Sequence, residues 1–205
     1  MARTAMTQPE VELRRDEILE AALALFEHGG IEAVSFRRIA AQLGCSYTAP
    51  YRYFASKHEL LTALRAQAFR WIERHMAAAI ASQGSPIEQL RKLARAYIEA
   101  ALDQPDRYAL MFFDIGEDDR EPPAELVEAK RAALDVCTQV VRAAEAAGQL
   151  SLRVDALSAS HLFWCGAHGL VSLQVGGQFM MGRDIATLTP MMIDTLIAGL
   201  ADVSR

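Results

Sequence analysis

Side chains that bind phosphate groups and base edges gather in one short stretch of this 205-residue chain, between residues 47 and 57. Tyrosine hydroxyls and a lysine ammonium group bind phosphate oxygens, whereas the small Thr48 and Ala49 can approach base edges and thymine methyl groups. The stretch therefore predicts a surface that contacts duplex DNA. The residues placed on it are Tyr47, Thr48, Ala49, Tyr51, Tyr53 and Lys57.

Two short helices joined by a tight turn are needed to present that surface. Ser35 is placed to cap a helix whose apolar residues recur with a helical period. Gly44 follows the last of them, where a left-handed residue ends a helix at least strain. Ser46 can cap a second helix from Tyr47 to about Phe54. This layout is typical of a helix-turn-helix, whose second helix enters the major groove.

The second helix contains a proline. Pro50 falls within its first turn, where the missing N–H costs at most one intrahelical bond, so we still expect an α-helix. Tyr53 fits either the core or the DNA surface, because its ring can pack while its hydroxyl stays in water. The residues expected in the core of this unit are Phe36, Ile39, Leu43, Cys45 and Phe54.

Residues 14–60 resemble the N-terminal domain of TetR-type transcriptional regulators. Many members of that family carry a bulky aliphatic residue where this chain has Pro50, a departure that affects the pitch of the second helix. The matching residues are Arg14, Ile18, Leu19, Ala21, Ala22, Leu25, Phe26, Gly30 and Ile31, then Ser35, Ile39, Ala40 and Gly44, and finally Ser46, Tyr51, Tyr53, Phe54, Ser56, Lys57 and Leu60.

The resemblance implies roles for single residues. Lys57 and Tyr51 are similar to phosphate contacts of the family, and Arg37 to a residue that reaches the backbone or a base. Arg38 could equally be an ordinary solvated residue. Tyr47, Thr48 and Ala49 resemble the base-reading positions, and Ser35, Arg38 and Ser46 complete the set expected at the DNA.

The charge distribution favours specific over indiscriminate DNA binding. The whole chain carries a net charge of −5, which is the wrong sign for a protein that coats DNA. Residues 33–60 differ, since they hold four Lys or Arg residues against one Glu. A basic patch on an acidic body narrows the docking poses, because the remaining surface repels phosphates.

Composition and motifs indicate a protein of the reducing cytoplasm. Cys45, Cys137 and Cys165 form no paired framework and no C-x-x-C motif. No segment resembles a signal peptide, and no apolar run approaches the ~20 residues of a membrane span. Motifs of the types G-x-S-x-G, H-E-x-x-H and glycine-rich phosphate loop are absent. We therefore expect no enzymatic activity, no cofactor and no membrane contact.

The helical pattern continues beyond residue 60, without strands or repeats. The sequence predicts an all-α fold of about nine helices, with a flexible arm over 1–12, a helix-turn-helix DNA-binding domain over 13–58, and a larger helical effector-binding and dimerisation domain over 59–205. The long helix from Leu60 to about Ser82 is covalently continuous with the DNA-reading unit. A ligand wedged against it could therefore change the spacing of the recognition helices.

Residues 90–113 and 164–173 resemble the C-terminal domain of a TetR subgroup named for a Trp…His-Gly motif. That resemblance implies a dimer in which the last two helices pair with their mates across a two-fold axis. Small and aliphatic side chains independently provide a surface for close helix approach. A dimer also fits a palindromic operator, whose recognition helices sit about one DNA turn (~34 Å) apart. The expected interface residues are Gly166, Gly169, Leu170, Leu173, Ile193, Leu196, Ile197 and Leu200.

An effector pocket in the helical body is expected to take an apolar or aromatic ligand, because few charges lie on the faces concerned. The same residue types at helical spacing are also typical of an ordinary core. The candidate lining residues are Trp71, His75, Met76, Tyr97, Met111, Phe112, Phe113, Cys137, Phe163, Trp164 and His168.

Two alternatives stay open beside the main interpretation. His161, Cys165 and His168 recur at i, i+4 and i+7 and could bind zinc or copper, which would make a metal-responsive regulator. The helical body could also be a protein-interaction scaffold. The main interpretation is a homodimeric repressor that leaves a palindromic operator when a small effector binds.

Overall fold

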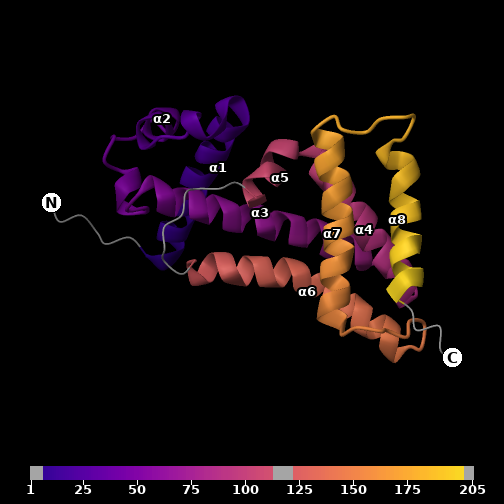
Figure 1. Cartoon of the computed structure of the whole chain (residues 1–205). Coiled ribbons are helices and arrows are strands. Elements are labelled where there is room, and N and C mark those ends of the chain that lie inside the picture. Colours follow the sequence, from indigo (N-terminus) through magenta and orange to yellow (C-terminus); the bar gives the residue numbers. More distant parts are fainter. Residues whose placement is uncertain (1–6, 113–121, 201–205) are drawn as a thin grey trace. The chain divides into compact units, whose positions relative to one another are not determined.

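The computed structural model describes residues 7–112 and 122–200, and over these ranges the chain is helical without strands (Figure 1). Within these ranges, eight α-helices and one 3-10 helix occupy the nine helical segments expected from the sequence. No helix over the described ranges combines the length and apolarity that crossing a membrane requires. The helices are α1 (Gln8–Ala33), α2 (Phe36–Gln42), η1 (Pro50–Arg52), α3 (Lys57–Ile80), α4 (Pro86–Asp103), α5 (Pro105–Phe112), α6 (Ala124–Ala146), α7 (Ala156–Val175) and α8 (Ile185–Leu200).

Two compact units make up the chain. The first runs up to Ala68 and resumes over Asp106–Leu126, so it holds α1, α2, η1, the start of α3 and most of α5. The second comprises Phe69–Pro105 and the residues from Val127 onward. Helices α3 and α6 therefore each carry residues of both units. The functional boundary expected at residue 58 is not defined by compactness and stays a prediction.

Helix α1 begins earlier than the sequence predicts. The Glu10 carboxylate accepts hydrogen bonds from the backbone N–H and the hydroxyl of Thr7, at 2.7 and 2.9 Å, and so closes the first turn. Residues 8–12, expected in a flexible arm, are therefore helical, while residues 1–6 lie outside the described ranges. Gly29 and Gly30 adopt non-helical backbone angles and kink the helix ahead of α2.

The turn after α2 forms as the sequence predicts. The Ser35 hydroxyl caps α2 by accepting the N–H of Arg38 at 3.4 Å. Gly44 has a φ of 62°, and the N–H of Cys45 donates to the Ala40 carbonyl at 3.0 Å. This Schellman arrangement satisfies carbonyls at the end of the helix and reverses the chain.

The segment after the turn, residues 46–54 and here called the reading segment, is not the expected α-helix. Only η1 (Pro50–Arg52) is regular. Pro50 has no N–H to donate to the Ser46 carbonyl, and the N–H of Ala49 takes that acceptor at 2.9 Å. The N–H groups of Arg52 and Tyr53 also bond three residues back, to the carbonyls of Ala49 and Pro50, and only that of Phe54 bonds four residues back. A proline in the turn that would nucleate an α-helix thus leaves a tighter 3-10 winding.

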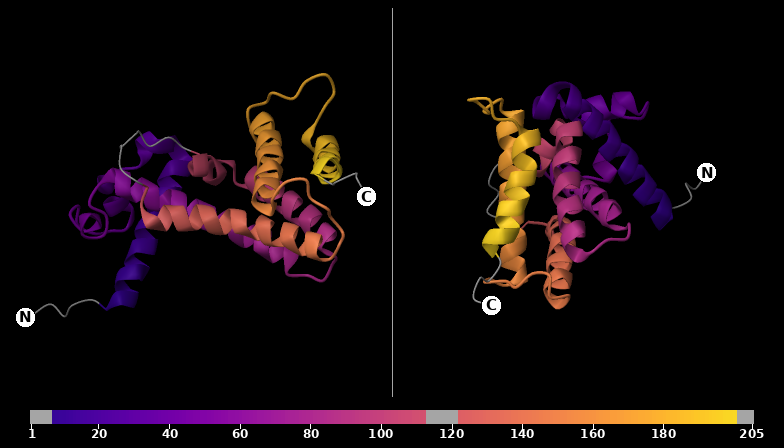
Figure 2. Two further views of the ribbon diagram at one scale, coloured as in Figure 1. Left: turned by 60° about the horizontal axis from the view of Figure 1, so that its bottom comes forward. Right: turned by 90° about the vertical axis from the view of Figure 1, so that its right-hand side faces the viewer.

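In the second unit, α7 and α8 lie side by side and α4 packs on α7 (Figures 1 and 2). Side-chain caps fix where these helices begin. Ser85 opens α4, and Asp155 opens α7 by accepting the N–H groups of Leu157 and Ser158, both at 3.0 Å. Hydrogen bonds from Ser158 are the main reason why the pKa of the Asp155 carboxyl lies below its usual value. The cap is therefore an ionised carboxylate near neutral pH.

Replacing Gly44 by Ala is expected to lower the free energy of unfolding by about 1–2 kcal/mol. A Cβ at this position meets no atom within 4 Å, so the cost arises from the left-handed backbone alone. Gly44→Asn should lose less, because asparagine tolerates that conformation. Urea unfolding of the three proteins measures the difference. An alanine variant as stable as the wild type would contradict this origin of the turn.

Candidate nucleic-acid interface

Most side chains predicted to contact DNA are exposed on α2 and the reading segment, two elements that are in contact. The structure thus brings the predicted residues to neighbouring elements, while the DNA contacts themselves stay a prediction. The exposed members are Arg37, Arg38, Ser46, Tyr47, Thr48, Tyr51 and Lys57, and the half-buried ones are Ser35, Ala49 and Tyr53.

Three aromatic rings order the surface of the reading segment. The ring centroid of Tyr51 lies 4.2 Å from that of Phe36, which is buried on α2. The Tyr47 ring meets Tyr51 edge-on with centroids 5.6 Å apart, and the two hydroxyl oxygens are separated by 3.1 Å. Such edge-to-face pairs are favourable beyond the area they bury. A buried ring therefore fixes two exposed tyrosines and their hydroxyls.

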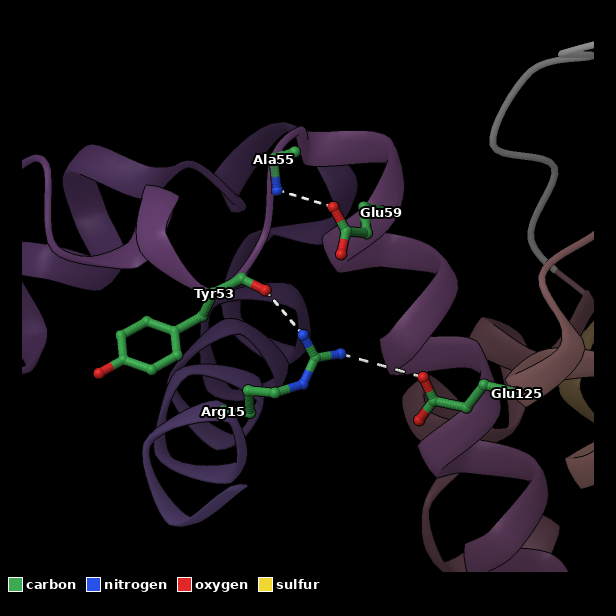
Figure 3. A network of polar contacts seen from close by, with 5 residues as sticks. All are labelled: Arg15, Tyr53, Ala55, Glu59 and Glu125. Atoms are coloured by element: carbon green, nitrogen blue, oxygen red, sulfur yellow. Dashed lines mark hydrogen bonds and ion pairs between the residues drawn. The ribbon is translucent and has the colours of Figure 1, made fainter. Parts of the chain in front are cut away.

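Arg15 of α1 joins the end of the reading segment to another part of the first unit (Figure 3). Its Nη1 donates to the Tyr53 carbonyl at 2.7 Å, and its guanidinium lies 4.3 Å from the centroid of the buried Phe54 ring. Its Nη2 is 3.9 Å from Oε2 of Glu125, in the first turn of α6. The Tyr53 ring points away from this network. One guanidinium thus binds the reading segment through both backbone and side chain.

Sequence reasoning missed this role of Arg15. Its hydrogen-bond partner lies 38 residues away and is a backbone carbonyl, which no residue pattern identifies. One signal was present: Arg15 precedes the buried Ile18, Leu19 and Ala22 at helical spacing, so it lies on the inner side of α1. Arg14, which the family resemblance includes, is exposed and pairs with a glutamate on its own helix.

Glu59 holds the chain where the reading segment runs into α3. Its carboxylate accepts the N–H of Ala55 at 2.7 Å (Figure 3). Its own N–H donates to the Ser56 hydroxyl at 3.1 Å. These two bonds make a reciprocal cap at the start of the helix. The one acidic residue among residues 33–60 is thereby committed to a cap.

Lys57 makes a contact that the sequence does not predict. Its ammonium group donates to the Ile31 carbonyl at 2.9 Å, which ties the start of α3 to the chain after the kink in α1. An ammonium group has three N–H donors, and this carbonyl uses one of them. Because the side chain is exposed, the observed hydrogen bond is compatible with the predicted phosphate contact.

Two residues expected in the core of this unit are exposed instead. Phe36, Ile39 and Phe54 are buried, as predicted. Leu43 is 36% exposed, and Cys45 is exposed as well. Both follow the last turn of α2, where the helix ends and the chain reverses, so neither side chain packs into the core.

The residues predicted to line an effector pocket are mostly buried, as an ordinary core would require, and the pocket stays a prediction. In the second unit, Trp71, Met76, Tyr97, Cys137 and Phe163 are buried, Trp164 and His168 are half-buried, and His75 is exposed. In the first unit, Met111 is buried and Phe112 exposed, while Phe113 lies outside the described residues.

Polar contacts join several of these residues inside the second unit. The indole Nε1 of Trp164 donates to the Tyr97 hydroxyl at 3.1 Å and so links α7 to α4. Burial raises the pKa of the Cys137 thiol to about 12, against a smaller opposing effect of its hydrogen bond with Ser160. Partial burial lowers the pKa of His168, which favours its neutral form. The Cys137 thiol is therefore uncharged near neutral pH, and the neutral form of His168 is favoured.

A cleft in the second unit lies between α4 and α8. Its volume is about 370 Å³, and none of the predicted pocket residues lines it. Pro190 lies inside α8 beside this cleft and removes one intrahelical hydrogen bond, because it has no N–H for the Ala186 carbonyl. The lining residues are Arg95, Ile98, Glu99 and Leu102 of α4 with Ile185, Ala186, Thr189 and Pro190 of α8.

Half of the residues predicted at a dimer interface pack within one chain. Leu170, Ile193 and Leu200 are buried in the isolated chain. A Cβ on Gly166 would lie 2.8 Å from Sδ of Met192, so this glycine lets α8 approach α7. These four residues therefore take part in packing within the subunit, and their place at a dimer interface stays a prediction. Both helices are apolar on more than one side, and the sequence does not reveal which side faces inward.

The other predicted interface residues keep accessible surface. Leu173 is 44% exposed, and a Cβ on Gly169 would meet no atom within 4 Å. Leu196 and Ile197 are half-buried. Packing within the chain therefore does not require a glycine at position 169.

His161, Cys165 and His168 are not assembled into a metal site. Over the described ranges, no three His, Cys, Asp or Glu side chains are placed to hold a metal ion. His161 Nδ1 lies 2.9 Å from the Leu157 carbonyl oxygen, and His168 Nε2 lies 3.4 Å from the Ser172 hydroxyl. The geometry does not support the metal-responsive alternative.

Two family models match the chain. The model of bacterial regulatory proteins of the tetR family matches residues 18–64, and that of the tetracyclin repressor-like C-terminal domain matches residues 90–196, more than half of the chain. The chain belongs to the TetR family. This membership confirms the predicted N-terminal helix-turn-helix and the all-helical fold.

The proteins similar to this TetR-family chain include other transcriptional regulators. The transcriptional repressor KstR2 of Mycobacterium tuberculosis is 34% identical over 91 residues, 44% of this chain and 46% of KstR2. The chain thus spans less than half the length of that relative. A solved protein of unknown function from Rhodococcus sp. RHA1 has a TM-score of 0.80 at 27% identity, over 92% of this chain and 95% of the other. The regulator FadR from Bacillus subtilis, solved with stearoyl-CoA, shares the fold, with a TM-score of 0.71 at 17% identity over 90% and 98% of the chains.

Arg15→Gln is expected to lower the free energy of unfolding by about 1–2 kcal/mol, because it removes a charged hydrogen bond and a cation–π contact. Amides of residues 53–56 should also exchange hydrogen faster. Arg14→Gln is the matched control and should leave stability nearly unchanged, since exposed ion pairs contribute little. Urea unfolding and hydrogen exchange measured by mass spectrometry test both variants. Equal effects of the two substitutions would contradict the role assigned to Arg15.

Proposed function

We propose that this protein is a homodimeric TetR-type repressor that binds a palindromic operator and leaves it when a small, largely apolar or aromatic effector binds. The observation that carries the proposal is the exposed basic and hydroxyl-bearing surface of α2 and the reading segment. The one carboxylate among residues 33–60, that of Glu59, is occupied in a helix cap. The repressor sign draws support from KstR2, which is itself a repressor.

Phosphates and bases are contacted by different residues in this proposal. Lys57 and Tyr51 bind phosphate oxygens, and Arg37 reaches the backbone or a base. Tyr47, Thr48 and Ala49 read base edges, and Ser35, Arg38, Ser46 and Tyr53 complete the surface. Residues 13–58 act as the DNA-binding domain, and residues 59–205 bind the effector and the second subunit.

The effector is proposed to act through α3. This helix begins directly after the reading segment and continues into the second unit, so a ligand that favours one position of its second half shifts the DNA-binding equilibrium. The side chains of Tyr97, Cys137 and Trp164 are themselves uncharged near neutral pH, which favours an apolar or aromatic ligand. The C-terminal region is further proposed to belong to the Trp…His-Gly subgroup, which residues 164–173 resemble.

The dimer is proposed to form on the accessible side of α7 and α8. Leu162, Gly169 and Leu173 recur at i, i+7 and i+11 on α7, and both leucines are exposed. Exposed Met191 adds apolar surface on α8. Glycine at position 169 permits close approach of a second backbone, because it has no side chain and its own chain leaves that space open.

Lys57→Ala should weaken binding to all DNA sequences alike and reduce the slope of log affinity against log salt by about 0.9, the value of one released counterion. Lys92→Ala removes the same charge from the second unit and is the control. Fluorescence anisotropy at four salt concentrations gives both slopes, and circular dichroism confirms folding, since Lys57 also binds Ile31. An unchanged slope would rule out the phosphate contact. If Lys57→Ala left the function of the protein unchanged, the interaction-scaffold alternative would be favoured.

Gly169→Leu is expected to shift the protein from dimer to monomer while each subunit stays folded, because a Cβ at this position meets no atom of its own chain within 4 Å. Gly166→Leu is the contrasting variant. Its Cβ would meet Met192 and Leu196 at 2.8 and 3.0 Å, so it should lower thermal stability. Sedimentation velocity and thermal unfolding separate the two effects. A Gly169→Leu protein that remains dimeric would contradict the proposed interface.

A further inference from the structure

Two exposed tyrosines of the reading segment form a hydroxyl pair. The Oη atoms of Tyr47 and Tyr51 lie 3.1 Å apart, and their side chains are 53% and 44% exposed. The Tyr51 ring packs on Phe36, and the Tyr47 ring packs on Tyr51. Contacts within the chain therefore set the position of the pair, and its hydroxyls are accessible to a ligand.

The pair offers fewer protons than two separate phenols. Each hydroxyl has one proton and two lone pairs, and the hydrogen bond between the oxygens consumes one proton. Either oxygen can be the donor in that bond, because both hydroxyls can rotate. One hydroxyl thus keeps a proton to donate outward, while the other presents lone pairs only. The pair can serve one external acceptor and one external donor.

Duplex DNA presents acceptors and donors in different places. Phosphate oxygens only accept, as do the N7 and O6 atoms of guanine and the O4 atom of thymine. The donors in the major groove are the exocyclic amino groups of adenine and cytosine. If one hydroxyl of the pair donates to a phosphate, the lone pairs of the other match only an amino group.

We infer, on the basis of the proposed DNA-binding function, that Tyr47 and Tyr51 bind DNA as a unit. Tyr51 donates its proton to a phosphate oxygen. Tyr47 donates to Tyr51 and accepts a hydrogen bond from the amino group of an adenine or cytosine. The base contact falls to Tyr47 because residues at the start of a recognition element reach base edges. Tyr47 is therefore a specificity-determining residue that distinguishes amino from keto edges.

Hydroxyl deletions define the position that Tyr47 reads. Duplexes are selected from a random pool with the wild-type protein, and their affinities are measured for Tyr47→Phe and Tyr51→Phe. Each substitution removes one hydroxyl and keeps the ring contacts. Tyr47→Phe should lose its base preference at one position of a half-site. Tyr51→Phe should weaken selected and scrambled duplexes by a similar factor. A Tyr47→Phe protein with the wild-type sequence preference would overturn the inference.

Base analogues then test the hydrogen bond itself. At the position found, purine replaces adenine, or 2-pyrimidinone replaces cytosine, so that only the amino group is lost. A 7-deazapurine in the same base pair removes an acceptor and is the control. The amino deletion should weaken binding of the wild type about 3- to 10-fold more than binding of Tyr47→Phe. The control should affect both proteins equally.

The outcomes separate this inference from the function on which it rests. The inference would be overturned if amino deletion weakened binding of both proteins equally. It would also be overturned if the 7-deazapurine weakened binding of the wild type more than binding of Tyr47→Phe. Either result would leave the proposed regulator function intact. A wild-type protein that enriches no sequence from the pool would overturn the proposed function, and the inference with it.

Discussion

The guanidinium of Arg15 donates a hydrogen bond to the Tyr53 carbonyl at 2.7 Å. This bond holds the end of the reading segment, which has little regular structure of its own. Pro50 removes a donor where an α-helix would nucleate, and the remaining 3-10 bonds have poorer geometry. Arg15 supplies support from α1 by binding the carbonyl at the end of the segment and covering the Phe54 ring. The orientation of the exposed hydroxyls therefore depends on a helix outside the reading segment.

The two helices whose first turns contact this region, α3 and α6, both continue along the chain into the second unit. Helix α6 places Glu125 beside Arg15 in its first turn and continues beyond Leu126 into the other unit. Helix α3 begins at Lys57, which binds a carbonyl near the end of α1, and also continues into the second unit. In a ligand-responsive regulator, these two helices are the covalent links through which a change in the body can reach the DNA-reading residues.

Features set by single residue types could be predicted from the sequence, whereas features set by distant partners could not. Ser35 and Gly44 bound α2 as expected, because capping and left-handed backbone depend on the residue itself. Pro50 was placed correctly in the first turn, but its missing donor changed the helix type. Arg15 was missed because its partner is a carbonyl 38 residues away. Gly166 was assigned to a dimer interface, since an apolar stripe does not show whether its partner belongs to the same chain.

The most direct test of the account is an anisotropy titration of the wild-type protein with a duplex enriched from a random pool and with its scrambled counterpart, at two salt concentrations. The surface on α2 and the reading segment predicts salt-sensitive binding that favours the enriched duplex by at least about 10³-fold. The enriched sequence should also contain two inverted half-sites about one DNA turn apart. Equal binding to both duplexes, or a pool that never enriches, would contradict the assignment of this surface to specific DNA recognition.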